Sequence, residues 1–321
     1  MSVREATLHQ TTLHERLSRL DAARELAGYH AQPAQMRAAA PGKVGELRLG
    51  FSLRHGRSVL SDLYRVAPLL VQQALYWDEA MPELPICSII SVGGGILQGD
   101  RYKIDISVGA GACALVTSQS ANRVHQMDAN YASQYQTVTL EAGSYLEYLP
   151  DFTIPYRGSR FLNQTDIVLP EDATLLYGEM MMSGRKHHHA EERFGLDLLS
   201  MAVAVHRPDG RKLFTEKILI EKGDARFDAA AVMGGFDAFA NIMCLTPPET
   251  AARIKARCET HFPQEEARAL SGVSRLPNGA GLMLRVVGIE SYDVRRQVRD
   301  FWRIVREEAR GRTLPEEFLW R

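Results

Sequence analysis

The chain has 321 residues, which is enough for one large domain or two small ones. Its hydrophobic fraction of 45% and its charged fraction of 24% are ordinary for a soluble globular protein. The formal net charge of −1 excludes a strongly basic field, so we expect neither nucleic acid nor a membrane among the partners.

Residues 1–42 differ in composition from the rest of the chain. They are polar, could open a short helix near Thr12, and end in the Ala-Gln-Pro-Ala-Gln stretch at 31–35 followed by Pro41 and Gly42. No apolar segment of a signal peptide is present. We predict a loosely held N-terminal extension and linker over residues 1–42, and a domain over residues 43–321.

From Gly45 onward the apolar residues recur with a period of two, which predicts strands with one buried face. Residues 45–53 and 102–108 alternate most regularly. Further strands are expected at 86–92, 112–117, 134–140, 145–149, 166–169, 198–206, 213–220 and 282–289. Turn sequences separate them, so the pattern indicates a mainly β body of many short strands. No fixed sequence period supports a regular solenoid.

Helices are expected mostly near the C-terminus. Thr246-Pro247-Pro248-Glu249 predicts a helix that runs to about residue 259, and a stronger pattern predicts one over 292–310. A further helix is expected around 228–245, which makes two or three peripheral helices. The last helix carries six arginines interleaved with acids, and we expect these on a solvated face. They are Arg295, Arg296, Arg299, Arg303, Arg306 and Arg310.

Four cysteines are scattered through apolar or helical stretches, and no two of them form a Cys-x-x-Cys pair. Buried, reduced thiols fit this pattern, which favours a cytoplasmic location. No apolar run approaches the ~18 residues of a membrane span. The cysteines are Cys87, Cys113, Cys244 and Cys258.

A glycine-rich loop at 93–100 has the glycine spacing of a phosphate-binding loop but not its chemistry. Asp100 stands where the phosphate-binding lysine belongs, and a carboxylate there would repel phosphate. The dinucleotide pattern also fails, because a strand follows the loop and not a helix. We therefore expect a hairpin connection that needs positive φ or a close approach of backbone.

Residues 117–125, Thr-Ser-Gln-Ser-Ala-Asn-Arg-Val-His, form a small and polar segment directly after an apolar strand. One interpretation is a turn whose hydroxyls and amides bond the local backbone. The other is a docking or channel-lining surface.

Three carboxylates lie in or beside apolar runs, namely Glu147, Asp151 and Glu179. Each can be an outward strand position, or it can be buried and need a partner, water or a passing cation. Met180-Met181-Met182 follows Glu179 and is typical of core filling.

A tract of three histidines, His187, His188 and His189, lies in a charged loop and could contact nickel, copper or zinc weakly. The remaining histidines are isolated. The chain has neither Gly-x-Ser-x-Gly nor His-Glu-x-x-His, so we predict no catalytic residues and no enzyme activity.

Four stretches together form a pattern whose order and spacing are specific enough to indicate a protein family. They are Gly94-Gly95 with Gly99-Asp100, Thr117 through Val124, Tyr148-Leu149-Pro150 with Thr153-Ile154, and Gly184-Arg185 with Glu192-Arg193-Phe194. This arrangement resembles the urease accessory protein family UreD, called UreH in some organisms, from about Gly45 to the end. The motif residues that we expect to serve the structure or an interface are Gly94, Gly95, Gly99, Asp100, Thr117, Gln119, Ser120, Arg123, Gly184 and Arg185.

The resemblance implies a β body with strands stacked in a helix-like arrangement and a non-enzymatic scaffold. It implies a complex with a UreF-like accessory protein and a UreG-like GTPase that docks on apo-urease and guides nickel to its dinickel centre. It also implies an internal path for nickel, and Glu147, Asp151 and Glu179 are the residues we expect to line it. No tightly bound cofactor is expected, only transient nickel.

Two other classes of function remain open. One is an all-β carbohydrate-active enzyme that uses paired carboxylates, which would show an exposed groove with aromatic side chains. The other is a free-standing metal-binding protein centred on the histidine tract.

Overall fold

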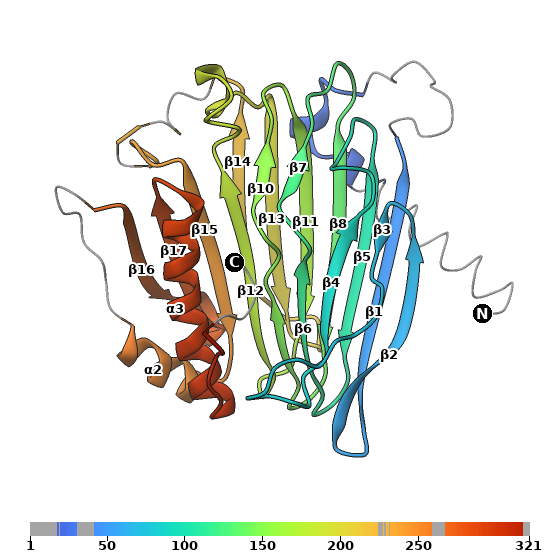
Figure 1. The fold of residues 1–321 in the computed structure, drawn as a ribbon, viewed down its shortest axis with the longest axis vertical. Helices are drawn as coiled ribbons and strands as arrows, with labels where there is room; N and C mark the ends of the chain where they lie inside the picture. The colour runs from blue at the N-terminus through green and yellow to red at the C-terminus, as the bar shows by residue number, and fades with distance from the viewer. Residues whose placement is uncertain are drawn as a thin grey trace, which may run out of the picture.

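The structure, a computed structural model, describes residues 18, 20–30, 42–223, 227, 229, 230, 232–258 and 267–316. Two large sheets dominate it and pack face to face around one apolar core (Figure 1). The predicted mainly β fold is therefore confirmed. None of the helices in the described part of the chain is long and apolar enough to cross a membrane.

The first sheet has seven strands in the order β14-β13-β11-β8-β5-β1-β2. Their bounds are β1 Val44–Arg54, β2 Arg57–Val66, β5 Arg101–Val108, β8 Ala132–Leu140, β11 Arg160–Val168, β13 Leu198–His206 and β14 Lys212–Glu221.

The second sheet has ten strands, eight of them in the order β16-β17-β15-β12-β9-β6-β4-β3, with β10 and β7 attached beside β12. Their bounds are β3 Leu69–Leu70, β4 Ile86–Ser91, β6 Cys113–Ser118, β7 Asn122–Val124, β9 Tyr145–Tyr148, β10 Thr153–Pro155, β12 Thr174–Met182, β15 Ala238–Leu245, β16 Ala269–Arg275 and β17 Gly281–Gly288.

The chain coils between the two sheets from β4 to β13. It alternates from the ten-stranded to the seven-stranded sheet, so β4, β6, β9 and β12 lie parallel in one and β5, β8, β11 and β13 lie parallel in the other. Parallel neighbours usually need a helical crossover. Here a strand of the opposite sheet makes the crossover, which gives the expected helix-like stacking.

The coil is irregular in sequence. Arg101, Ser133, Leu162 and Ser200 occupy one row across four neighbouring strands, at unequal separations along the chain. Each strand therefore shows the period-two alternation of apolar residues. The number of residues between successive turns of the coil varies, so the sequence has no longer fixed period.

Helices α2 (Pro248–Arg257) and α3 (Ser291–Arg310) pack on the outer face of the ten-stranded sheet, next to β16 and β17 (Figure 1). Both were predicted. The apolar stripe of α3, including Val298 and Trp302, is fully buried there. The helix ends at Gly311, whose φ is +63°. Short 3-10 turns lie at η1 (Arg24–Leu26), η2 (Ala190–Glu192) and η3 (Pro277–Gly279).

The prediction of a helix over 228–245 is wrong, because Ala238–Leu245 is strand β15. Every residue of β15 is buried, since the strand lies between two neighbours with a core on each face. A continuous apolar run of this kind has no period that separates strand from helix.

Residues 20–30 make contacts that the sequence analysis did not predict. Leu20 and Leu26 are buried in a third apolar cluster with Tyr135, Leu162 and Leu198 of the seven-stranded sheet. Glu25 bonds Ser200 and Lys217 on the same face. Residues 20–30 therefore cover the outer face of this sheet, whereas residues 1–17, 19 and 31–41 lie outside the described residues.

Candidate functional site

The motif segments that are far apart in the sequence meet at one end of the two sheets. Ile96 of the glycine loop pairs with Val124 of β7, and His125 Nε2 lies 3.3 Å from the carbonyl oxygen of Gly94. The His125 ring packs on Tyr156, with 4.9 Å between the ring centroids. The same Tyr156 ring lies 3.9 Å below the guanidinium of Arg185.

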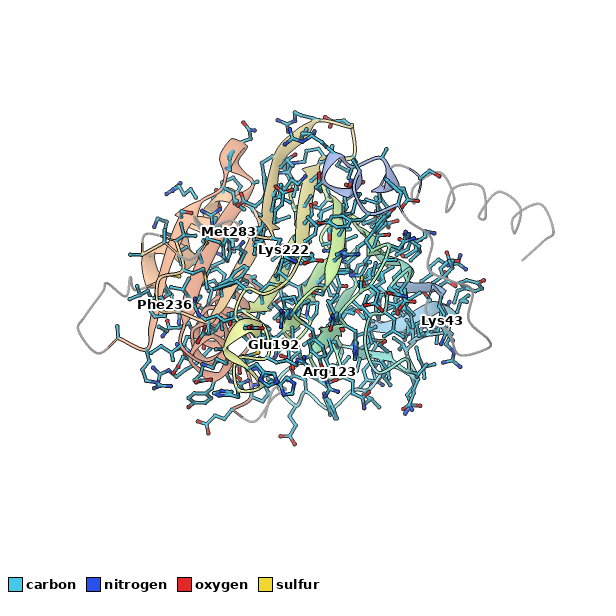
Figure 2. The ribbon with its side chains drawn as sticks, turned by 90° about the horizontal axis from the view of Figure 1, so that it is seen from above. Lys43, Arg123, Glu192, Lys222, Phe236 and Met283 are labelled. Atoms are coloured by element: carbon cyan, nitrogen blue, oxygen red, sulfur yellow. The ribbon has the colours of Figure 1, made fainter. Side chains whose placement is uncertain are left out.

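Arg185 links this group to the loop that follows β12, because it bonds the carboxylate of Glu192 through Nε and Nη2. The Arg185 partner holds the pKa of the buried Glu192 below its usual range, although burial acts in the opposite direction. Figure 2 looks down on this end of the molecule and shows Arg123 and Glu192 on it.

Two motif glycines allow the close approach of backbone that brings these segments together. A Cβ on Gly95, whose φ is +142°, would lie 2.6 Å from the carbonyl oxygen of Arg123. A Cβ on Gly184, whose φ is +137°, would lie 2.2 Å from the carbonyl oxygen of Glu192. The expected close approach is confirmed, but the glycine loop is not a hairpin. It crosses from β4 of one sheet to β5 of the other.

Asp100 closes the glycine loop from inside. Its buried carboxylate accepts hydrogen bonds from the backbone N–H groups of Lys43 and Leu97, both at 2.9 Å, and from the Tyr102 hydroxyl at 2.7 Å. With all these donors it holds the turn in place. The motif pattern marked Asp100 as a structural or interface residue, but the sequence gave no signal for the three donors that it binds.

The polar segment after β6 bonds local backbone, because the Ser118 hydroxyl donates to the Ser120 carbonyl at 2.9 Å. Thr117 is buried, and its hydroxyl donates to the carbonyl of the distant Leu149 at 2.7 Å. Gln119, Ser120 and Arg123 line a pocket of about 120 Å³ together with Gly94 and Gly95. We call this pocket the rim pocket.

A cavity of about 70 Å³ lies between the two sheets, and both polar and apolar side chains line it. It has Ile89, Ser91 and Asn122 in common with the rim pocket, so the two are adjacent. Its volume is enough for a few water molecules. Polar side chains from four strands line it, namely Gln134, Gln136, Tyr148, Asn163, Tyr177 and Glu179.

Glu179 is the carboxylate that faces this cavity from β12. It accepts hydrogen bonds from the Tyr177 hydroxyl at 2.9 Å and from Asn163 Nδ2 at 3.4 Å. Among the described residues no lysine or arginine forms an ion pair with it. Burial raises the pKa of Glu179 to about 7, and the two hydrogen bonds only partly oppose this rise.

Asp151 lines the same cavity where the ten-stranded sheet is interrupted. β9 ends at Tyr148, and the pairing of β12 on this side resumes only where Met181 meets Thr153 of β10. The Asp151 carboxylate is paired with Arg295 of α3, whose Nη2 lies 2.6 and 2.8 Å from its two oxygens.

Glu147 does not line this cavity. Strand alternation turns Tyr148 toward the cavity and Glu147 toward α3, where Arg306 binds it. Arg306 is fully buried and also bonds Asp78, so the expectation that it lies on a solvated face is wrong. Its place next to Trp302 and Val305, in the apolar stripe of the helix, was the available signal for a buried partner.

The histidine tract is exposed, and His187 Nε2 lies 3.9 Å from the Glu290 carboxylate. No group of three His, Cys, Asp or Glu in the described ranges is arranged to hold a metal ion. Met180 and Met181 face opposite cores, which agrees with core filling. Cys87, Cys113 and Cys244 are buried and Cys258 half-buried, all four as free thiols.

Comparison with known proteins agrees with the motif pattern. The model of the UreD urease accessory protein family matches residues 43–321. Urease accessory protein UreD 2 of Methylorubrum extorquens (strain PA1) is 76% identical over 97% of this chain and 100% of its own length. Urease accessory protein UreD 3 of Methylorubrum populi is 74% identical over the same shares. Urease accessory protein UreD of Yersinia enterocolitica is 52% identical over 92% of each chain.

Proposed function

Because the chain belongs to the UreD family of urease accessory proteins, we propose that it is a non-enzymatic urease maturation factor that gives nickel a path between its two sheets. In this proposal it acts with a UreF-like accessory protein and a UreG-like GTPase, and the complex docks on apo-urease in the cytoplasm. Nickel is its cargo and not a resident cofactor.

One observation supports the path above the others. Glu179 is a buried carboxylate on the cavity between the sheets, and no cationic side chain of the described residues forms an ion pair with it. Leaving such a group charged is costly unless water or a cation compensates it. Burial raises the pKa of Glu179 and favours its protonated form, so we propose that a passing hydrated divalent cation displaces this proton.

The ligand set suits transfer more than storage. Glu179 and Asp151 offer carboxylate oxygens, and the remaining polar lining is amide and hydroxyl. Nickel exchanges more readily from such oxygen ligands than from a closed cage of thiolates and imidazoles. The rim pocket beside the cavity is formed by motif segments, so we propose it as one mouth of the path.

The small volume of the cavity between the sheets, about 70 Å³, favours this function over a carbohydrate-active enzyme, which needs a groove long enough for a sugar chain. The exposed histidine tract supports only weak metal contact, because ordering a flexible loop around a metal costs entropy.

The test is the nickel content of urease purified from cells that carry Glu179→Leu or Asp151→Leu. We expect both bulky variants to lower nickel per urease active site while the complex still assembles, because they fill the path and remove its charge. Asp172→Leu, at an exposed turn before β12, is the matched control. Normal nickel loading in both path variants would refute the path.

A further inference from the structure

Helix α3 makes two ion pairs with carboxylates of the ten-stranded sheet, and the two differ in kind. Arg306 binds Glu147 through both Nε and Nη2, with no exposed surface on either side chain. Arg295 reaches both oxygens of Asp151 through Nη2 alone, and 26% of its side chain is exposed. A fork-shaped, fully buried pair is the stronger of the two, whereas a partly exposed pair through a single nitrogen is weaker and easier to displace.

The Arg295 pair also has an unused donor. Arg295 Nε is buried and has no hydrogen-bond partner in the described part of the chain. Full use of the guanidinium would therefore need a different position of the carboxylate. The observed arrangement is not the strongest that these two groups can make.

The Arg295–Asp151 pair lies where the ten-stranded sheet is interrupted. On β12, residues 178–180 lie in the gap between the pairing with β9 and the pairing with β10. The cavity is lined there by Gly178 and Met180, whose positions face α3, as well as by Glu179, which faces the other sheet. Asp151 therefore lies at an opening through the sheet, between the cavity and Arg295.

We propose that Arg295 is a positioning residue that binds Asp151 reversibly at this opening. A divalent cation that crosses here must displace the Arg295 guanidinium from the Asp151 carboxylate, and we call this exchangeable arginine the latch. This inference rests on the proposed nickel path. The latch keeps Asp151 oriented without a metal and prevents its carboxylate from trapping one.

The direction of the expected effect separates a latch from a merely structural ion pair. If Arg295 only stabilised the fold, its loss would weaken or leave unchanged any binding of metal. If it competes with the cation, its loss frees Asp151 Oδ2, leaves Oδ1 bonded only to the Phe152 backbone N–H at 2.8 Å, and removes a nearby positive charge. Metal should then bind more tightly, by about three- to fivefold for a partly exposed pair.

The experiment is a titration of the purified full-length chain, with its co-expressed partner where one is needed for solubility, with Ni²⁺ alone. We expect Arg295→Gln to bind Ni²⁺ three- to fivefold more tightly than the parent and Arg295→Lys to lie between them. The Asp151→Asn/Arg295→Gln double variant should lose this gain. Arg296→Gln, at the exposed neighbouring position, should leave the affinity unchanged.

An unchanged or weaker affinity in Arg295→Gln, with Arg295→Lys agreeing, overturns the latch. Failure of the path itself is distinguishable by the nickel content of urease. Normal loading with both Glu179→Leu and Asp151→Leu removes the path but leaves a tighter-binding Arg295→Gln to be explained by Asp151. Blocked loading with Glu179→Leu and an unchanged affinity in Arg295→Gln removes the latch alone.

Discussion

Arg306 binds Glu147 with Nε 2.8 Å from Oε1 and Nη2 2.6 Å from Oε2, and both side chains are completely buried. The Tyr145 hydroxyl donates to Oε1 as well, at 2.6 Å, and a second carboxylate, Asp78, contacts the same guanidinium. This network fastens α3 to the outer face of the ten-stranded sheet.

We expect Arg306→Ala to lower the free energy of unfolding by about 3–5 kcal/mol, because it leaves buried carboxylates without a cation. Glu147→Ala should cost less than Arg306→Ala, since Asp78 still pairs with the arginine. Urea denaturation measures both. Asp62→Ala, which breaks an exposed pair with Arg48, is the control and should cost under about 1 kcal/mol. Equal costs in all three variants would contradict the network.

Glu179 should make stability depend on pH. Its pKa is about 7 in the folded protein against an ordinary 4.5, so the folded state retains a proton that the unfolded state loses. The stabilisation is fully present below pH 4.5 and is lost as the pH rises through 7, by about 3 kcal/mol.

The measurement is the unfolding free energy of the parent and of Glu179→Gln between pH 4.5 and 8. The difference between them should change across this window, because glutamine cannot ionise. Parallel curves would show that the Glu179 carboxyl titrates normally.

Adjacent glycines at the rim offer a matched pair of substitutions. Gly94→Ala places a methyl group where no atom of the described residues lies within 4 Å, so only its φ of +76° opposes alanine, at about 1 kcal/mol. Gly95→Ala adds a contact of 2.6 Å with the Arg123 carbonyl and must move backbone. Urea denaturation should therefore show a clearly larger loss for Gly95→Ala, and equal losses would disprove the close approach.

Triple replacement of His187, His188 and His189 by alanine should leave urease activation in cells largely intact. The tract is exposed, and none of its side chains reaches the cavity between the sheets. Weak binding of Ni²⁺ or Zn²⁺ by the purified chain should decrease in the same variant. A loss of activation comparable to deletion of the protein would show that the tract is essential.

Local patterns in the sequence predicted local structure well. Alternation in residues 45–53 and 102–108 identified β1 and β5, and the apolar stripe identified α3. Strand β15 was missed because burial on both faces removes the alternation. The packing of Leu26 on the seven-stranded sheet was missed because the flanking composition is polar and its partners lie more than a hundred residues away.

The sequence indicated several residues of the candidate site, but not how they are arranged in space. The motif pattern singled out Gly95, Arg123 and Arg185, yet no local signal showed that they meet at one end. Asp151 and Glu179 do line one cavity, and Glu147 does not, because one step along a strand reverses the face of the sheet. Contacts such as Arg295 with Asp151 depend on how α3 docks, which no stretch of sequence encodes alone.

Both ends of the parallel coil terminate in strands of opposite direction. β2 and β14 run antiparallel to their neighbours in one sheet, and so do β3 and β16 in the other. In the described part of the chain the edge strands therefore run against the direction of the coil. A strand of a second copy that kept the direction of the coil would have to pair antiparallel with them, so the parallel ladder ends within one molecule.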